Sequence, residues 1–234
     1  MIARYAWRGG EELIFATGVG NRPKLLVLQP LFEEANRTRR LLAGVMRALA
    51  DAGLDGVLPD LPGMGDSLTP LSAVDVQDWR DALAAFAAVL DTPFVTLAVR
   101  GGALIDDVPG AAGHLRLAPV DGTSIIRNLF RTRLAADRED AASADMAALE
   151  LQAANTPIEL GGNRLGPALV AGLRDTALPL VSPLRTLRLE SDPAPADAKL
   201  AAAPLWRRAE PGDDPALARS LASEAIDWVR ACVG

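Results

Sequence analysis

The sequence has one cysteine and one histidine among its 234 residues. The single Cys232 excludes a disulfide framework and a cysteine metal site, and it agrees with a reducing compartment. No segment approaches the roughly 18 uncharged apolar residues that a membrane span needs. The first eight residues carry charges within their apolar stretch, so a signal peptide is not expected. These absences predict a soluble, cytoplasmic protein with no metal and no membrane span.

The chain also lacks an excess of positive charge. It has 24 Lys and Arg against 30 Asp and Glu, a net charge of −6. Because phosphate binding needs a concentrated excess of Lys and Arg, nucleic acid is not an expected partner. Arginines gather only at 37–40 and 127–133, which we interpret as solvated helix faces. The length predicts one domain over residues 1–234.

Buried-strand patterns and amphipathic helical patterns alternate from residue 24 to residue 120. This alternation predicts a mostly parallel, doubly wound sheet of about eight strands in an α/β fold. An antiparallel hairpin with a Gly9-Gly10 turn is expected before it. The expected strands are 24–30, 55–59, 93–99 and 114–120, and the expected helices are 37–52, which Asn36 would cap, and 76–90.

The later chain differs in its pattern. Between residues 121 and 183 strand character disappears and helical spacing predominates, which predicts a helical, lid-like insertion. Residues 184–190 alternate as a strand, and a last short strand is expected over 204–210 before a helix whose apolar face spans 217–229.

The central stretch is residues 93–104, where an apolar run stops at Arg100 and is followed by two glycines. This pattern predicts a buried strand that turns sharply into a closely packed helix. An arginine at the end of such a strand needs a partner or water. Glu33 and Glu34, which follow the neighbouring strand, are the expected partners. We expect one of them within about 4 Å of Arg100, the range of an ion pair.

Several segments together resemble a known family. They are residues 29–40 (QPLFEEANRTRR), 60–67 (DLPGMGDS), 97–104 (LAVRGGAL), 118–122 with 131–133, and 204–206. With these motifs the chain resembles the α/β-hydrolase fold family and, within it, the exosortase A system-associated hydrolases of the second type. The resemblance implies that fold, and it implies an association with exopolysaccharide synthesis and a membrane exosortase. A hydrolase activity is implied by the family's title only.

The residues of a serine-hydrolase triad are not all found at their expected positions. The family's G-x-S-x-G elbow aligns with Ala98-Val99-Arg100-Gly101-Gly102, so arginine replaces the nucleophile. The one histidine, His114, begins the strand after the elbow instead of following the last strand, and we interpret it as structural. Asp192 lies in the region where the family has its catalytic acid. No histidine is expected there for it to orient, so it has no partner in a triad. Ser67 is interpreted as a turn residue.

Three interpretations of Arg100 remain open. It forms an ion pair that fills an inactive site, or it holds an anion together with the amides of Gly101 and Gly102, or it takes part in chemistry that the pattern does not reveal. We expect four loops to line one crevice at the carboxyl edge of the sheet, at 30–36, 60–67, 100–102 and 190–197. The candidate pocket residues are Leu31, Phe32, Glu33, Glu34, Arg100, Gly101 and Asp192.

The expected function is that of an accessory or ligand-binding protein of an exosortase and exopolysaccharide system, with a small anionic or acyl ligand. The alternative is an esterase-like or thioesterase-like hydrolase of unconventional mechanism, with carboxylates as the general base. A structural subunit is a third class, and it predicts an exposed apolar patch on the insertion around Ile125, Ile126, Leu129 and Phe130. No cofactor is expected, because Pro23 interrupts the weak dinucleotide motif at 18–23.

Overall fold

The computed structural model describes residues 1–18, 22–139 and 145–234. The middle of the glycine-containing run at 18–23 therefore lies outside the described residues. Within the described part of the chain, no helix combines the length and apolar character that crossing a membrane would require.

The main sheet has eight strands in the order β1-β2-β4-β3-β5-β6-β9-β10. The pairs β1–β2 and β2–β4 are antiparallel, and the other neighbours are parallel. The predicted α/β class and strand number are confirmed. The strands are β1 (Ile2–Trp7), β2 (Gly10–Thr17), β3 (Lys24–Leu28), β4 (Asp55–Pro59), β5 (Phe94–Val99), β6 (His114–Leu117), β9 (Leu184–Leu189) and β10 (Ala198–Leu200).

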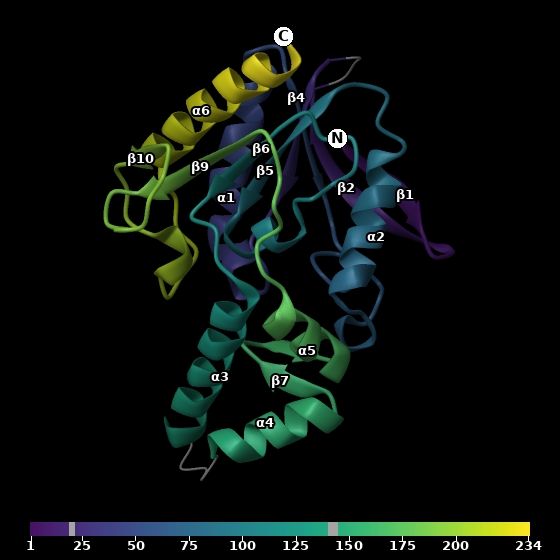
Figure 1. The fold of residues 1–234 in the computed structure, drawn as a ribbon, viewed down its shortest axis with the longest axis vertical. Helices are drawn as coiled ribbons and strands as arrows, with labels where there is room; N and C mark the ends of the chain where they lie inside the picture. Colours follow the sequence, from purple (N-terminus) through teal and green to yellow (C-terminus); the bar gives the residue numbers. More distant parts are fainter. Residues whose placement is uncertain (19–21, 140–144) are drawn as a thin grey trace.

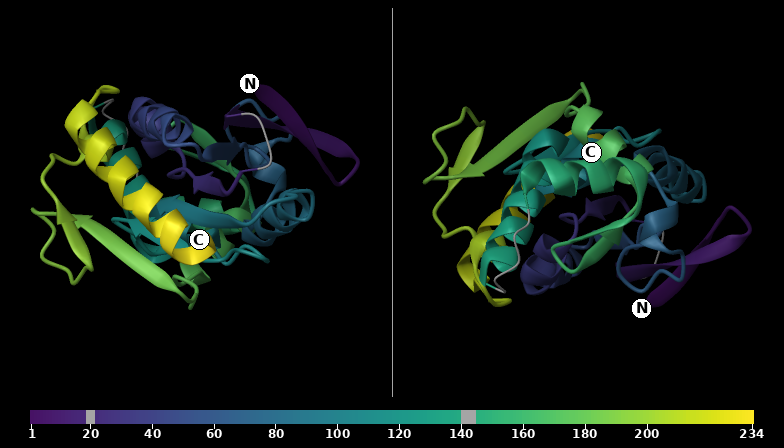
Figure 2. Two further views of the ribbon diagram at one scale, coloured as in Figure 1. Left: turned by 90° about the horizontal axis from the view of Figure 1, so that it is seen from above. Right: turned by 90° about the horizontal axis from the view of Figure 1, so that it is seen from below.

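Helices cover both faces of this sheet (Figures 1 and 2). On one face, α1 (Glu33–Asp51) and α6 (Pro215–Val233) pack on each other and on the parallel strands. On the other face, α2 (Val76–Ala87) buries Trp79, Leu83 and Phe86. Asp75 and Asp78 form a capping box at the start of α2, which satisfies backbone N–H groups there. The sheet is therefore buried on both sides, as a parallel sheet requires.

An insertion separates β6 from β9 and extends from one end of the sheet (Figure 1). It contains α3 (Gly122–Glu139), α4 (Met146–Asn155), a hairpin of β7 (Ile158–Leu160) and β8 (Asn163–Leu165), and α5 (Pro167–Asp175). The sequence did not predict the hairpin, because strands of three residues are too short to show an alternating pattern. Gly161 and Gly162, both at positive φ, form its turn.

Three other expectations about local structure were wrong. The first turn is formed by Arg8 and Gly9, both at positive φ, and Gly10 already pairs with Trp7 in the ladder. The last strand is β10, fourteen residues before α6 begins, and residues 205–207 form a 3₁₀ turn that buries Leu205 and Trp206. The segment after Arg100 is also a 3₁₀ turn, Arg100–Ile105, in place of the expected helix. It is followed by Asp106, whose side chain pairs with Arg116.

Candidate functional site

The central strand β5 ends in a sharp elbow at Arg100. Val99 is extended, with φ −108° and ψ 126°, whereas Arg100 has φ 54°. A residue other than glycine is rarely found at positive φ, because its β-carbon crowds the backbone there. A β-carbon on Gly102 would lie 2.4 Å from the carbonyl oxygen of Leu28, so only glycine fits against β3. The elbow geometry typical of a hydrolase nucleophile is therefore present, but the residue at its tip is arginine.

Arg100 binds Glu34 at two points. Its Nε donates to Oε2 and its Nη2 to Oε1, each at 3.0 Å. Nη1 donates to the carbonyl oxygen of Ala118 at 3.2 Å, and the guanidinium carbon lies 4.9 Å from the centroid of the Trp206 ring. The Arg100 and Glu34 side chains are 15% and 22% exposed. The expected ion pair is confirmed, and each guanidinium nitrogen has a partner.

Glu34 reaches Arg100 because α1 begins earlier than the sequence predicted. Asn36 does not cap the helix; the helix starts at Glu33, after Phe32, which has φ 58°. Acidic residues are favoured in a first helical turn, where unpaired N–H groups create a partial positive charge. The chain therefore enters α1 directly from the end of β3, and the first turn of α1 faces the elbow on the adjacent β5.

Glu33 has a different environment from Glu34. A β-carbon on Gly161 would lie 3.0 Å from its Oε2, so the β7–β8 turn covers this carboxylate. Burial raises the pKa of Glu33, and its own backbone N–H and the positive charge of Arg37 act in the opposite direction. Glu33 is thus a partly buried carboxylate beside the elbow that does not pair with Arg100.

The space left at the elbow is small. A cavity of about 30 Å³ is lined by Leu31, Phe32, Glu33, Glu34 and Arg100, and α3 closes it with Ile125, Asn128 and Leu129. Such a volume holds about one water molecule. Gly101 is buried, and a β-carbon on it would lie 2.7 Å from Cδ1 of Ile125. The interpretation that Gly101 and Gly102 hold a phosphate or carboxylate therefore lacks the necessary room in this conformation.

Asp192 does not join this group. Its Oδ2 accepts from Nη1 of Arg188 at 2.7 Å, and its Oδ1 accepts from the backbone N–H of Ala194 at 3.0 Å. The Ala194 bond, followed by the Arg188 bond, lowers the pKa of Asp192. The four loops do not all share one crevice. Loops 30–36 and 100–102 line the elbow cavity, loops 30–36 and 60–67 line a larger cavity beside α1, and Asp192 lines neither.

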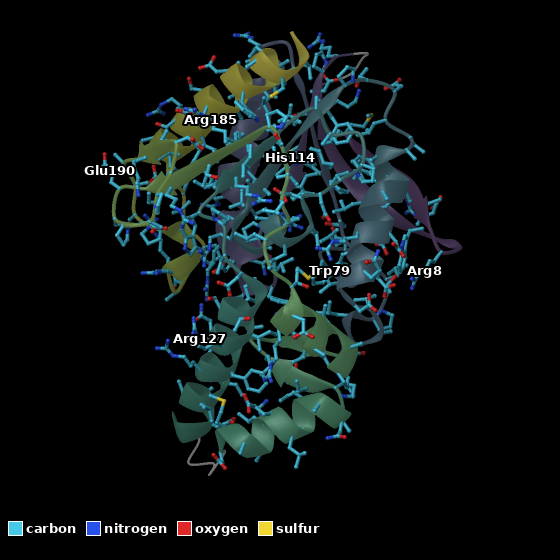
Figure 3. All side chains as sticks on the ribbon, in the orientation of Figure 1. Arg8, Trp79, His114, Arg127, Arg185 and Glu190 are labelled. Atoms are coloured by element: carbon cyan, nitrogen blue, oxygen red, sulfur yellow. The ribbon has the colours of Figure 1, made fainter. Side chains whose placement is uncertain are left out.

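His114 and Ser67 have structural positions. His114 is buried at the start of β6, where its Nδ1 lies 3.1 Å from Oγ1 of Thr96 on β5 (Figure 3). Burial lowers the pKa of His114. Ser67 Oγ accepts from the backbone N–H groups of Gly63 and Thr69 and donates to Glu12 Oε1, so it organises the loop after β4.

A second ion pair, which is fully buried, lies behind the elbow. Arg116 on β6 donates from Nε to Oδ2 of Asp106 at 2.6 Å and from Nη2 to Oδ1 at 2.7 Å. Their side chains are 5% and 0% exposed. The sequence analysis did not identify this pair, although an arginine within the apolar run at 114–120 signals a charge that must have a buried partner.

The insertion packs its apolar side chains inward. Ile126, Leu129 and Phe130 are each at most 3% exposed, and Ile125 is partly buried against the core, so these four residues do not form the exposed apolar patch that a purely structural subunit requires. Arg127 points away from the fold on the outer side of α3, as a solvated helix face would (Figure 3). Within residues 1–18, 22–139 and 145–234, no cluster of three or more His, Cys, Asp or Glu side chains could hold a metal ion.

Comparison with known proteins identifies the fold. No family model and no curated protein matches the chain. Among solved structures it is similar to Est1E from Butyrivibrio proteoclasticus with ferulic acid bound (TM-score 0.65, 12% identity, 99% of each chain covered). It is also similar to a thermophilic esterase from Thermogutta terrifontis (0.60, 15%, 100% of each chain) and to mouse alpha/beta hydrolase domain-containing protein 10 (0.62, 12%, 99% of each chain). The chain therefore has the α/β-hydrolase fold, with an ion pair at the elbow.

Proposed function

We propose that this protein is an α/β-hydrolase-like protein without a Ser-His-Asp triad, which acts as an accessory protein of an exosortase-associated exopolysaccharide system in the cytoplasm. The observation that carries the non-catalytic part is the Arg100–Glu34 pair. It occupies the elbow where a nucleophile would stand, and the residual cavity is about 30 Å³. The exosortase association rests on the sequence resemblance at residues 29–40, 60–67 and 97–104.

The arrangement around the pair supports a structural role. A serine acts as a nucleophile only when an adjacent base takes its proton. The one histidine of the chain is buried against Thr96. In this proposal the chain forms one domain over residues 1–234, and residues 121–183 act as a lid over the elbow, since α3 contributes Ile125 and Leu129 to the closure.

The test of the non-catalytic part is a fluorophosphonate probe combined with a panel of p-nitrophenyl esters on the purified protein. We expect neither labelling nor turnover above that of heat-denatured protein. Labelling at a serine that is abolished when that serine is changed to alanine would overturn this proposal. For the accessory role, binding to the detergent-solubilised exosortase from the same genome is measured by interferometry, with an unrelated membrane protein as the control. Equal binding to both would contradict it.

A second candidate is a hydrolase that uses a carboxylate base, and Glu33 favours it. Burial raises the pKa of Glu33, and within the described residues no side chain donates a hydrogen bond to it. A carboxylate in this state can accept a proton from a water molecule beside the elbow. If ester turnover is found, Glu33→Gln should abolish it and Glu190→Gln, an exposed control, should not. Retained turnover in Glu33→Gln would exclude this mechanism.

A further inference from the structure

A cavity of about 400 Å³ lies between α1, the first strands of the sheet and the loop after β4, and it shares Phe32 with the elbow cavity. Small-molecule sites in proteins typically have volumes of about 300–1,000 Å³. Three adjacent strands contribute its apolar floor: Ile2 pairs with Phe15, and Phe15 pairs with Leu58. Ile2 and Phe15 are 73% and 42% exposed, so this floor is open to solvent.

Local sequence explains why the cavity exists. One face of α1 lines it, and that face carries the small residues Ala35 and Ala43 beside Leu42 and Met46. On β2 the side chains alternate, so Leu13 and Phe15 lie on this face, whereas Ala16 belongs to the core on the opposite face. The apolar floor of the cavity therefore continues onto the side of α1. Together these two surfaces can enclose the apolar part of a small molecule.

The other end of the cavity is polar, and its charge is unbalanced. Asp60 and Asp66 line it against a single guanidinium, that of Arg39. Oδ2 of Asp60 accepts from the backbone N–H of Asp66 at 3.0 Å, and in the described part of the chain no ion pair includes Asp60. Burial raises the pKa of Asp60 above its ordinary value, and the charges of Asp66 and Glu12 add to that effect. The hydrogen bond from the Asp66 N–H and the charge of Arg39 act in the opposite direction. A cation placed at this carboxylate would relieve the unfavourable charge.

We propose that this cavity is a binding site for a small amphipathic amine, whose ammonium group faces Asp60 and whose apolar body lies along Ile2, Phe15 and Leu58. An anionic amphiphile would place its charge beside two carboxylates and one arginine, which is unfavourable. The inference does not depend on the Arg100–Glu34 pair, because neither residue lines this cavity.

The test is a titration of the full chain with hexylamine, hexanoate and hexanol, followed by NMR of the ¹⁵N-labelled protein. We expect hexylamine to bind most strongly and to shift the amide resonances of the cavity residues. Asp60→Asn keeps an acceptor for the Asp66 N–H and should weaken hexylamine binding about tenfold or more. Asp51→Asn is the matched control and should have no effect. It changes an exposed acid at the end of α1, the helix that lines the cavity.

A second variant separates loss of the site from loss of the fold. Ala43→Leu fills the cavity from α1 without changing any charge, and we expect it to weaken the binding of hexylamine and hexanol alike while the melting temperature stays near that of the parent. The proposal is overturned if hexanoate binds as strongly as hexylamine, if hexylamine binding survives both variants, or if none of the three probes shifts the cavity resonances.

Discussion

Arg100 and Glu34 stand 66 positions apart in the chain, and two hydrogen bonds of 3.0 Å join their side chains across the elbow of the central strand. The pair occupies the space above the elbow that a hydrolase needs for its substrate. The pair is partly exposed to solvent. Its removal should change both the stability of the protein and the shape of the site.

Replacing the arginine by the residue that a hydrolase has there should not restore activity. Arg100→Ser leaves the Glu34 carboxylate without its partner, and we expect a loss of about 1–3 kcal/mol, below the full value for a buried pair because solvent reaches it. Ester turnover should not rise, because the chain has one histidine and it is buried against Thr96. A thermal melt beside a p-nitrophenyl acetate assay measures both, with Arg40→Ser on the exposed face of α1 as the control. Substantial turnover at an unchanged melting temperature would show that a base is already poised at the elbow.

The buried Arg116–Asp106 pair should contribute more to the free energy of unfolding than the Arg100–Glu34 pair does. Asp106→Asn leaves the Arg116 charge uncompensated among side chains that are 5% exposed or less, and we expect a loss of about 3–5 kcal/mol. The double variant Arg116→Met with Asp106→Leu removes both charges and should lose less than Asp106→Asn alone. Urea unfolding of the three proteins measures this. A double variant that loses as much stability as Asp106→Asn, or more, would contradict this expectation.

The two glycines after Arg100 should differ in their tolerance of a methyl group. In Gly102→Ala the β-carbon would lie 2.4 Å from the Leu28 carbonyl oxygen. This oxygen is part of the backbone, so it cannot shift without a cost in free energy. In Gly101→Ala it would meet Cδ1 of Ile125 at 2.7 Å, the end of a flexible side chain. We expect Gly102→Ala to lose about 1–3 kcal/mol and Gly101→Ala clearly less, as measured by chemical unfolding. The reverse order would mean that the elbow packs differently from this structure.

The stability should depend on pH through His114. Burial lowers its pKa in the folded state, so below its ordinary value of 6.5 the unfolded chain takes up a proton that the folded chain does not. The free energy of unfolding therefore falls as the pH decreases through this value. Glu33 and Asp60, whose pKa values burial raises, act in the opposite sense at lower pH. The histidine contribution is thus isolated by comparing the parent with His114→Asn.

The measurement is urea unfolding of both proteins between pH 5 and pH 8, together with the NMR titration of the single histidine ring. We expect the parent to lose more stability on acidification than the variant, and the ring to titrate below its ordinary pKa. A ring that titrates at or above that value would disprove the buried, uncharged state of His114.

The sequence by itself determined the α/β class, the mostly parallel sheet and the arginine at the end of its central strand. Periodicity is a local property: apolar runs at 24–30 and 93–99 predict buried strands wherever they pack, and helical spacing over 76–90 predicts a helix. That Arg100 pairs with Glu33 or Glu34 could also be predicted, because strands that are adjacent and parallel bring their carboxyl ends together. The choice of Glu34 came from the structure.

Only the tertiary structure decided what surrounds the elbow. The start of α1 at Glu33, the partners Ala118 and Trp206 of Arg100, and the hairpin turn over Glu33 all depend on segments distant in sequence. The volumes of the two cavities depend on how closely α3 and α1 approach the sheet. Distances between packed elements depend on many side-chain contacts at once, and a local sequence pattern does not determine them. The sequence could therefore identify residues of the site but not the space between them.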